Sequence, residues 1–141
     1  MSGFLLDTNC ISEAVRVHPE PRVLSWLGAA DESLLHLSVL TLGEIRKGVA
    51  ALAQSKRRTL LETWVEAELQ TRFAGRILPI DAGVADRWGV LAAAVKLKGA
   101  TISTVDGLRA ATALHHNLTI VSRNVGAFAH TKVPVFNPWN A

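Results

Sequence analysis

Short apolar runs alternate with longer helical patterns along this chain, and this alternation constrains the fold more than any other feature of the sequence. Runs typical of buried strands occur at 4–6, 34–38, 77–80, 118–122 and 133–136. Helical spacing of apolar residues occurs over about 8–16, 23–28, 40–52, 56–73, 82–97 and 106–115. Strands that are separated by helices pair in parallel. We therefore predict an α/β domain with a central, mostly parallel sheet of four or five strands and helices on both faces.

The size and composition of the chain suit one globular domain over residues 1–141. A length of 141 residues is enough for one hydrophobic core, and 49% hydrophobic with 19% charged residues are ordinary values for a globular protein. No uninterrupted apolar stretch reaches the ~18 residues of a membrane span, and the N-terminal sequence lacks the regions of a signal peptide. No membrane association is expected, and a cytoplasmic location is the default.

Three acidic residues stand out because of their positions relative to the predicted strands. Asp7 comes directly after the run at 4–6. Glu44 lies in the first turns of the helix after the run at 34–38. Asp106 follows the stretch 102–105, which leads into the next helix and which we count as a further strand, so that each acid is placed after a strand. Ligands gather outside the carboxyl ends of strands in open α/β sheets, so the three carboxylates could meet in one pocket.

Clustered carboxylates repel each other, and a divalent cation is the simplest remedy because it neutralises several of them at once. Taken alone, each acid has an equally good structural explanation, as a helix cap or as a solvated side chain. Their joint placement favours a shared site.

Other notable residues have structural explanations. Asp81 also follows a strand but begins a helix, and we expect it to cap that helix. Cys10 is the only cysteine, which excludes an internal disulfide, and a small packing role is expected for it. The sequence has no glycine-rich phosphate loop, Walker motif or G-x-S-x-G elbow. A nucleotide-binding fold and a serine hydrolase are therefore poorly supported.

The basic residues are compatible with a polyanionic ligand. The formal net charge is only +3, which by itself does not demonstrate nucleic-acid binding. Arg46 and Lys47 lie within three residues of Glu44 and could contact the phosphate oxygens of a nucleic-acid backbone, without reading bases. A solvated helix face is the simpler explanation for both.

Four sequence blocks, in a fixed order, resemble those of a known family: L-L-D-T-N-C-I-S-E at 5–13, S-V-L-T-L-G-E-I-R-K-G at 38–48, V-D-G-L-R-A-A-T-A at 105–113, and S-R-N-V-G-A-F at 122–128 followed by V-F-N-P-W at 135–139. The chain resembles the PIN-domain ribonucleases of the VapC toxin family, particularly the FitB-like branch. The resemblance implies a three-layer α/β/α domain, dependence on Mg²⁺ or Mn²⁺ and endonucleolytic cleavage of RNA. It also implies a homodimer and inhibition by a cognate VapB-like antitoxin in a hetero-oligomer.

The same resemblance implies roles for individual residues. Three residues resemble the family's catalytic, metal-binding acids: Asp7, Glu44 and Asp106. Four residues resemble its auxiliary polar positions: Asn9, Ser122, Arg123 and Asn124. The family's usual fourth acid is absent, because its two common positions hold Asn124 and Ala127. One carboxylate fewer weakens the binding of a second cation, so occupancy by one metal is consistent with this sequence.

Two functional hypotheses follow. The first is a metal-dependent endoribonuclease, the toxin of a type II toxin–antitoxin pair, in which Mg²⁺ at the three acids activates a water for attack on an RNA phosphodiester. The second, motivated by Ala127, is a catalytically impaired binding module that keeps the fold, the antitoxin contacts and RNA affinity. In both cases operator DNA would be bound only through the antitoxin. An antitoxin arginine inserted among the carboxylates would inhibit the site directly.

Overall fold

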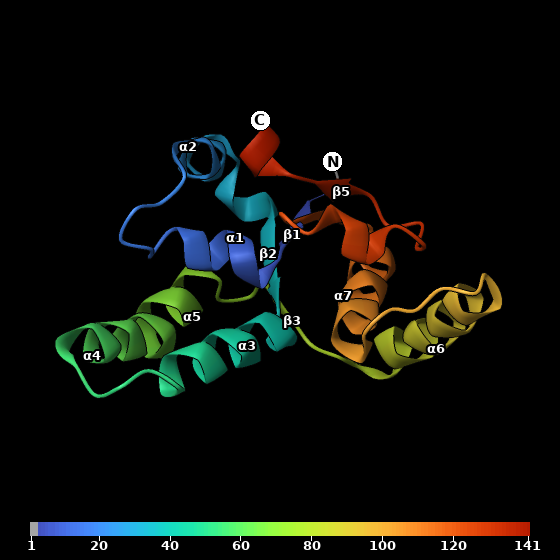
Figure 1. Ribbon diagram of the computed structural model, residues 1–141, viewed down its shortest axis with the longest axis horizontal. Helices are drawn as coiled ribbons and strands as arrows, with labels where there is room; N and C mark the ends of the chain where they lie inside the picture. The colour runs from blue at the N-terminus through green and yellow to red at the C-terminus, as the bar shows by residue number, and fades with distance from the viewer. Residues whose placement is uncertain (1–2) are drawn as a thin grey trace.

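A five-stranded sheet forms the centre of the computed structural model, which describes residues 3–141 (Figure 1). The strands are β1 (Phe4–Leu6), β2 (Leu35–Ser38), β3 (Ile77–Leu78), β4 (Thr119–Val121) and β5 (Val135–Phe136). Their order across the sheet is β3-β2-β1-β4-β5, and every neighbouring pair runs parallel. The predicted parallel sheet is confirmed, with strands shorter than the apolar runs at most positions because the runs extend into the adjoining loops.

The helices also follow the predicted pattern. They are α1 (Thr8–Glu13), α2 (Pro21–Ala29), α3 (Val39–Ala50), α4 (Lys56–Thr63), α5 (Gln70–Arg72), α6 (Ala82–Leu97) and α7 (Thr104–His115). Between α4 and α5 the segment Trp64–Leu69 is π-helical, so the single helix expected over 56–73 contains a π-helical stretch. None of the helices among residues 3–141 combines the length and apolar composition that crossing a lipid bilayer requires.

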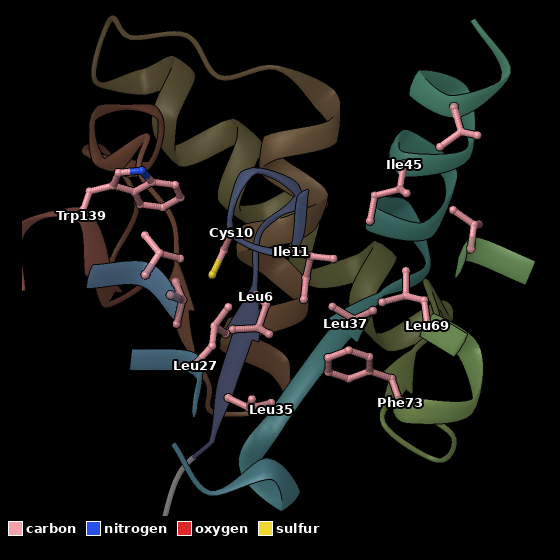
Figure 2. Close-up of a cluster of buried hydrophobic side chains, with 14 residues drawn as sticks. Leu6, Cys10, Ile11, Leu27, Leu35, Leu37, Ile45, Leu69, Phe73 and Trp139 are labelled. Carbon is pink, nitrogen blue, oxygen red and sulfur yellow. The ribbon is translucent and has the colours of Figure 1, made fainter. Parts of the chain in front are cut away.

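Two hydrophobic clusters cover the two faces of the sheet, because successive strand residues point to opposite sides. Leu6 belongs to the larger cluster, which is formed with α1, α2, α3 and the π-helical segment. Figure 2 shows Cys10 and Ile11 of α1 above the sheet residues Leu6 and Leu37 within this cluster. Leu5 belongs to the second cluster, formed with α6 and α7. The resulting helix–sheet–helix layering is the predicted α/β/α architecture.

The expectation that Asp106 follows a strand is wrong. Among the described residues, the stretch 100–103 that precedes α7 has no strand, and β1 already has β2 and β4 as its neighbours. The stretch connects α6 to α7 and ends in a helix cap, in which the Ser103 side chain accepts a hydrogen bond from the Asp106 backbone N–H at 3.1 Å. Close packing of the two helices depends on Gly107, where a Cβ would lie 2.9 Å from Nε1 of Trp88. Asp106 is therefore positioned by α7.

The capping role expected for Asp81 is confirmed. Its Oδ1 accepts a hydrogen bond from the Val84 backbone N–H at 2.9 Å at the start of α6. Asp81 is thereby accounted for as a structural residue.

Candidate active site

Three elements bring acidic side chains to one end of the sheet. Asp7 directly follows β1 and caps α1, where its Oδ1 accepts a hydrogen bond from the Thr8 backbone N–H at 2.8 Å. Glu44 lies on α3, which begins as soon as β2 ends, and Asp106 lies in the first turn of α7. The side chains are 9%, 41% and 29% exposed in that order, so the cluster extends from the interior to the surface.

The three carboxylates meet around Arg109, which is three residues after Asp106 on α7 and whose side chain is only 2% exposed. Its Nη1 donates a hydrogen bond to Asp106 Oδ1 at 3.0 Å. Its Nη2 donates to Glu44 Oε1, which also accepts a hydrogen bond from the Thr8 hydroxyl at 2.7 Å. The remaining nitrogen, Nε, lies 3.1 Å from Asp7 Oδ1 as an ion pair, without a hydrogen-bond partner among residues 3–141. Each guanidinium nitrogen therefore faces a different acid.

A polar network behind the cluster fixes Asp7. The Ser122 hydroxyl, which is fully buried, donates to Asp7 Oδ2 at 2.7 Å. The same hydroxyl oxygen accepts hydrogen bonds from the Asn9 side chain at 3.3 Å and the Asn124 backbone N–H at 3.0 Å. The Asn9 side-chain oxygen accepts from the Arg123 backbone N–H at 3.3 Å. The segment after β4 therefore holds the segment after β1 in register with the cluster.

Replacing Ser122 by alanine is expected to destabilise the protein by about 2 kcal/mol, because a buried carboxylate oxygen loses its donor. Urea unfolding monitored by circular dichroism measures the effect. The control is Ser33→Ala, which removes an exposed serine hydroxyl that donates to Asp31 at 2.7 Å. It should cost less than ~0.5 kcal/mol. Equal effects of the two substitutions would contradict the role given to Ser122.

The other residues that the sequence analysis discussed as site residues have contacts of their own or are exposed. Arg46 is on α3, but its guanidinium pairs with Glu66 at 3.1 Å, and Lys47 next to it is exposed. The Arg123 guanidinium lies over the Trp139 ring, 5.6 Å from its centroid. Ala127 is packed against the second hydrophobic cluster, so its methyl group has a structural role.

A groove beside the cluster offers room for a ligand. It lies between α1, α3 and the helical segment beginning with α4, has a volume of about 390 Å³ and includes Thr8, Glu44, Arg57 and Trp64 in its lining. A chain bound there would pass next to the exposed end of the acid cluster.

Cys10, three residues after Asp7, is fully buried. Burial, reinforced by the charge of Asp7, raises the pKa of its thiol to about 12. The packing role expected for Cys10 is thus the better explanation.

The donor chemistry of the cluster suits a hard cation, but its arrangement does not fit one. Mg²⁺ requires oxygen ligands that converge at about 2.0–2.1 Å in nearly octahedral geometry. Here one carboxylate oxygen from each of Asp7, Glu44 and Asp106 is directed at the guanidinium of Arg109. Among residues 3–141 no three acidic, histidine or cysteine side chains are arranged so that they could hold a metal ion.

Sequence reasoning missed Arg109. One signal was present: an arginine interrupts the alanine-rich stretch of α7 three residues after Asp106, which places both on one face of the helix. The same reasoning also missed Thr8, whose hydroxyl holds Glu44. The sequence did not indicate that the side chains of Arg109 and Thr8 contact acids on other elements.

Comparisons with known proteins agree on the fold and family. The profile described as "PIN domain" matches residues 4–133. The chain is 42% identical over 136 residues to Toxin FitB of Neisseria gonorrhoeae, covering 96% of this chain and 98% of that protein. It is 37% identical over 135 residues to VapC ribonuclease Y4jK of Sinorhizobium fredii, covering 96% of each. The solved structure of FitAB bound to an IR36 DNA fragment superposes with a TM-score of 0.92 at 41% identity, covering 96% of this chain and 95% of that chain.

Proposed function

This chain belongs to the PIN-domain family, among the FitB- and VapC-type toxins, and we propose that it is the toxin of a type II toxin–antitoxin pair and acts as an endoribonuclease. The observation that carries the proposal is the meeting of Asp7, Glu44 and Asp106 at one end of the sheet, beside an open groove. A relative that is 37% identical is named a VapC ribonuclease, which supports RNA as the substrate.

The residues of this chain have distinct tasks in the proposed reaction. Asp7, Glu44 and Asp106 form the catalytic site, and Ser122 and Asn9 hold Asp7 in position. The groove admits a single strand whose phosphates pass the exposed carboxylate of Glu44. Arg46 and Lys47, on the helix that carries Glu44, contact backbone phosphates, and Arg46 must exchange its ion pair with Glu66 to do so.

Mg²⁺, with Mn²⁺ as a substitute, is the cofactor proposed for the three acids. Either cation would enter only in molecules whose Arg109 side chain has withdrawn from the cluster, because the carboxylates otherwise face the guanidinium. Cleavage by the unaltered chain is therefore slow.

The proposed partner is a VapB-like antitoxin, in a hetero-oligomer that contains a homodimer of this chain. The solved relative named FitAB is bound to a DNA fragment, which supports operator binding by the complex. We assign the DNA contact to the antitoxin, so any association of this chain with operator DNA is indirect.

Incubation with a long single-stranded RNA tests the proposal. We expect slow internal cleavage that requires Mg²⁺ or Mn²⁺, and a decrease of at least about 100-fold in Asp7→Asn, because this substitution removes a carboxylate from the centre of the site. Gel electrophoresis of end-labelled RNA measures the rate. Asp86→Asn, at an exposed acid on α6, is the matched control and should cleave at the unaltered rate. Cleavage that persists both in EDTA and in Asp7→Asn would refute the proposal.

A binding module with negligible turnover is the second candidate. It is favoured by the guanidinium among the acids and by the lack of a carboxylate at Asn124 and Ala127. None of the relatives' names supports it. Such a protein would retain RNA in the same assay without cutting it, with or without a divalent cation.

A further inference from the structure

We infer that Arg109 supplies from within this chain the positive charge that the three acids need, and that it keeps a divalent cation out of the cluster. The inference rests on the proposed function, because it assigns the same acids to the active site. It goes further by making Arg109 an internal competitor of the cofactor. The structure then represents a closed state of the site.

The contacts of Arg109 are those of a built-in counter-ion. A guanidinium carries donors in a planar fork and remains charged at all physiological pH values. Here the three guanidinium nitrogens of Arg109 each face a carboxylate oxygen, from Asp7, Glu44 and Asp106 respectively. Only 2% of the Arg109 side chain is exposed. A buried charge without partners is very costly, so withdrawal of the Arg109 side chain from the three carboxylates is unfavourable.

The same contacts exclude a cation in two ways. Both oxygens of Asp7 already have partners, because Oδ1 faces Thr8 and Arg109 while Oδ2 accepts from Ser122. Glu44 Oε1 is shared by Thr8 and Arg109. A cation entering the cluster would also lie within a few ångströms of the guanidinium, and like charges at that distance repel strongly in a partly buried site.

The segment 122–128 after β4 contains no acid to offset this repulsion. Asn124 is exposed and contributes its backbone N–H to Ser122, and Ala127 contacts the second hydrophobic cluster. With three carboxylates and one guanidinium, the cluster is already partly neutralised. Its demand for a divalent cation is correspondingly smaller.

Mn²⁺ binding followed by electron paramagnetic resonance tests the inference without any RNA. We expect Arg109→Leu to bind Mn²⁺ at least ~100-fold more tightly than the unaltered chain, because the positive charge in contact with the three carboxylates is removed. The melting temperature of Arg109→Leu should rise by about 5–10 °C at an Mg²⁺ concentration ~100 times its dissociation constant. That of the unaltered chain should not change at the same concentration.

Two further variants locate the binding. Arg109→Leu combined with Asp7→Asn should lose the gained Mn²⁺ affinity. Arg22→Leu removes an exposed arginine that pairs with Glu20 at 2.7 Å and should bind Mn²⁺ as weakly as the unaltered chain. Equal Mn²⁺ affinity in Arg109→Leu and the unaltered chain would overturn the inference.

The unaltered chain decides the question even if Arg109→Leu does not fold. Its bound Mn²⁺ should be the same with and without Asp7→Asn, whereas a tenfold loss in Asp7→Asn would show a cation already in the cluster and would overturn the inference. If Arg109→Leu binds Mn²⁺ tightly but leaves RNA intact, the role of Arg109 stands and the proposed ribonuclease function fails.

Discussion

Arg109→Leu is expected to cleave RNA about 100-fold faster than the unaltered chain at an Mg²⁺ concentration that saturates the variant but not the unaltered chain. The substitution keeps an apolar side chain on α7 but removes the guanidinium, which leaves the oxygens of Asp7, Glu44 and Asp106 free to converge on a cation. A gain of this size follows if the fraction of molecules holding the cation limits the rate, because removal of a nearby unit charge changes that fraction by a similar factor.

Rates of internal cleavage, measured as a function of Mg²⁺ concentration, distinguish this gain from a general loosening of the fold. The concentration for half-maximal rate should fall in Arg109→Leu, and Asp7→Asn added to this variant should abolish the gain. Arg22→Leu should behave as the unaltered chain. A variant that is unchanged or slower, although folded, would contradict the role of Arg109 as a competitor of the cofactor.

In EDTA, the same Arg109→Leu substitution is expected to lower the free energy of unfolding by about 2–3 kcal/mol. Loss of one partner from a fully buried ionic cluster costs about 3–5 kcal/mol, and a smaller loss is expected here because Glu44 and Asp106 are 41% and 29% exposed and are partly screened by water. The remaining three carboxylates then repel each other without a cation. Urea denaturation at low ionic strength measures the loss.

The cause of this destabilisation can be checked by removing the repulsion. Arg109→Leu combined with Glu44→Gln and Asp106→Asn should recover most of the lost stability, and added salt should recover part of it in Arg109→Leu alone. Arg22→Leu should change the free energy of unfolding by less than ~0.5 kcal/mol, because its ion pair is exposed. No recovery in the triple variant would mean that lost packing, and not charge, explains the effect.

Local patterns predicted most of the fold. The helix α6 (Ala82–Leu97) was predicted with its observed bounds because Asp81 caps its start, and Gly99, at φ +76°, follows its end. The position of Asp7 at the end of β1 was also visible, since the acid directly follows an apolar run. These features are set by residues that are adjacent in the sequence, so they can be predicted from one sequence alone.

Features that depend on distant neighbours were not predictable in the same way. The stretch before Asp106 has an extended pattern, but it connects α6 to α7 and is not a strand of the sheet. The ion pair between Arg46 and Glu66 depends on how α3 packs against the following helical segment. Arg109 is the most consequential case, because the spacing placed it on the face of Asp106 but did not show that its side chain reaches Asp7 and Glu44.

Crystals of the unaltered chain soaked in MnCl₂ provide the most direct test of the central claim, through an anomalous difference map recorded near the manganese edge. We expect no manganese peak among Asp7, Glu44 and Asp106, and density for the Arg109 guanidinium in contact with all three carboxylates. A peak coordinated by two or more of these carboxylates, with Arg109 turned away from the cluster, would contradict the claim.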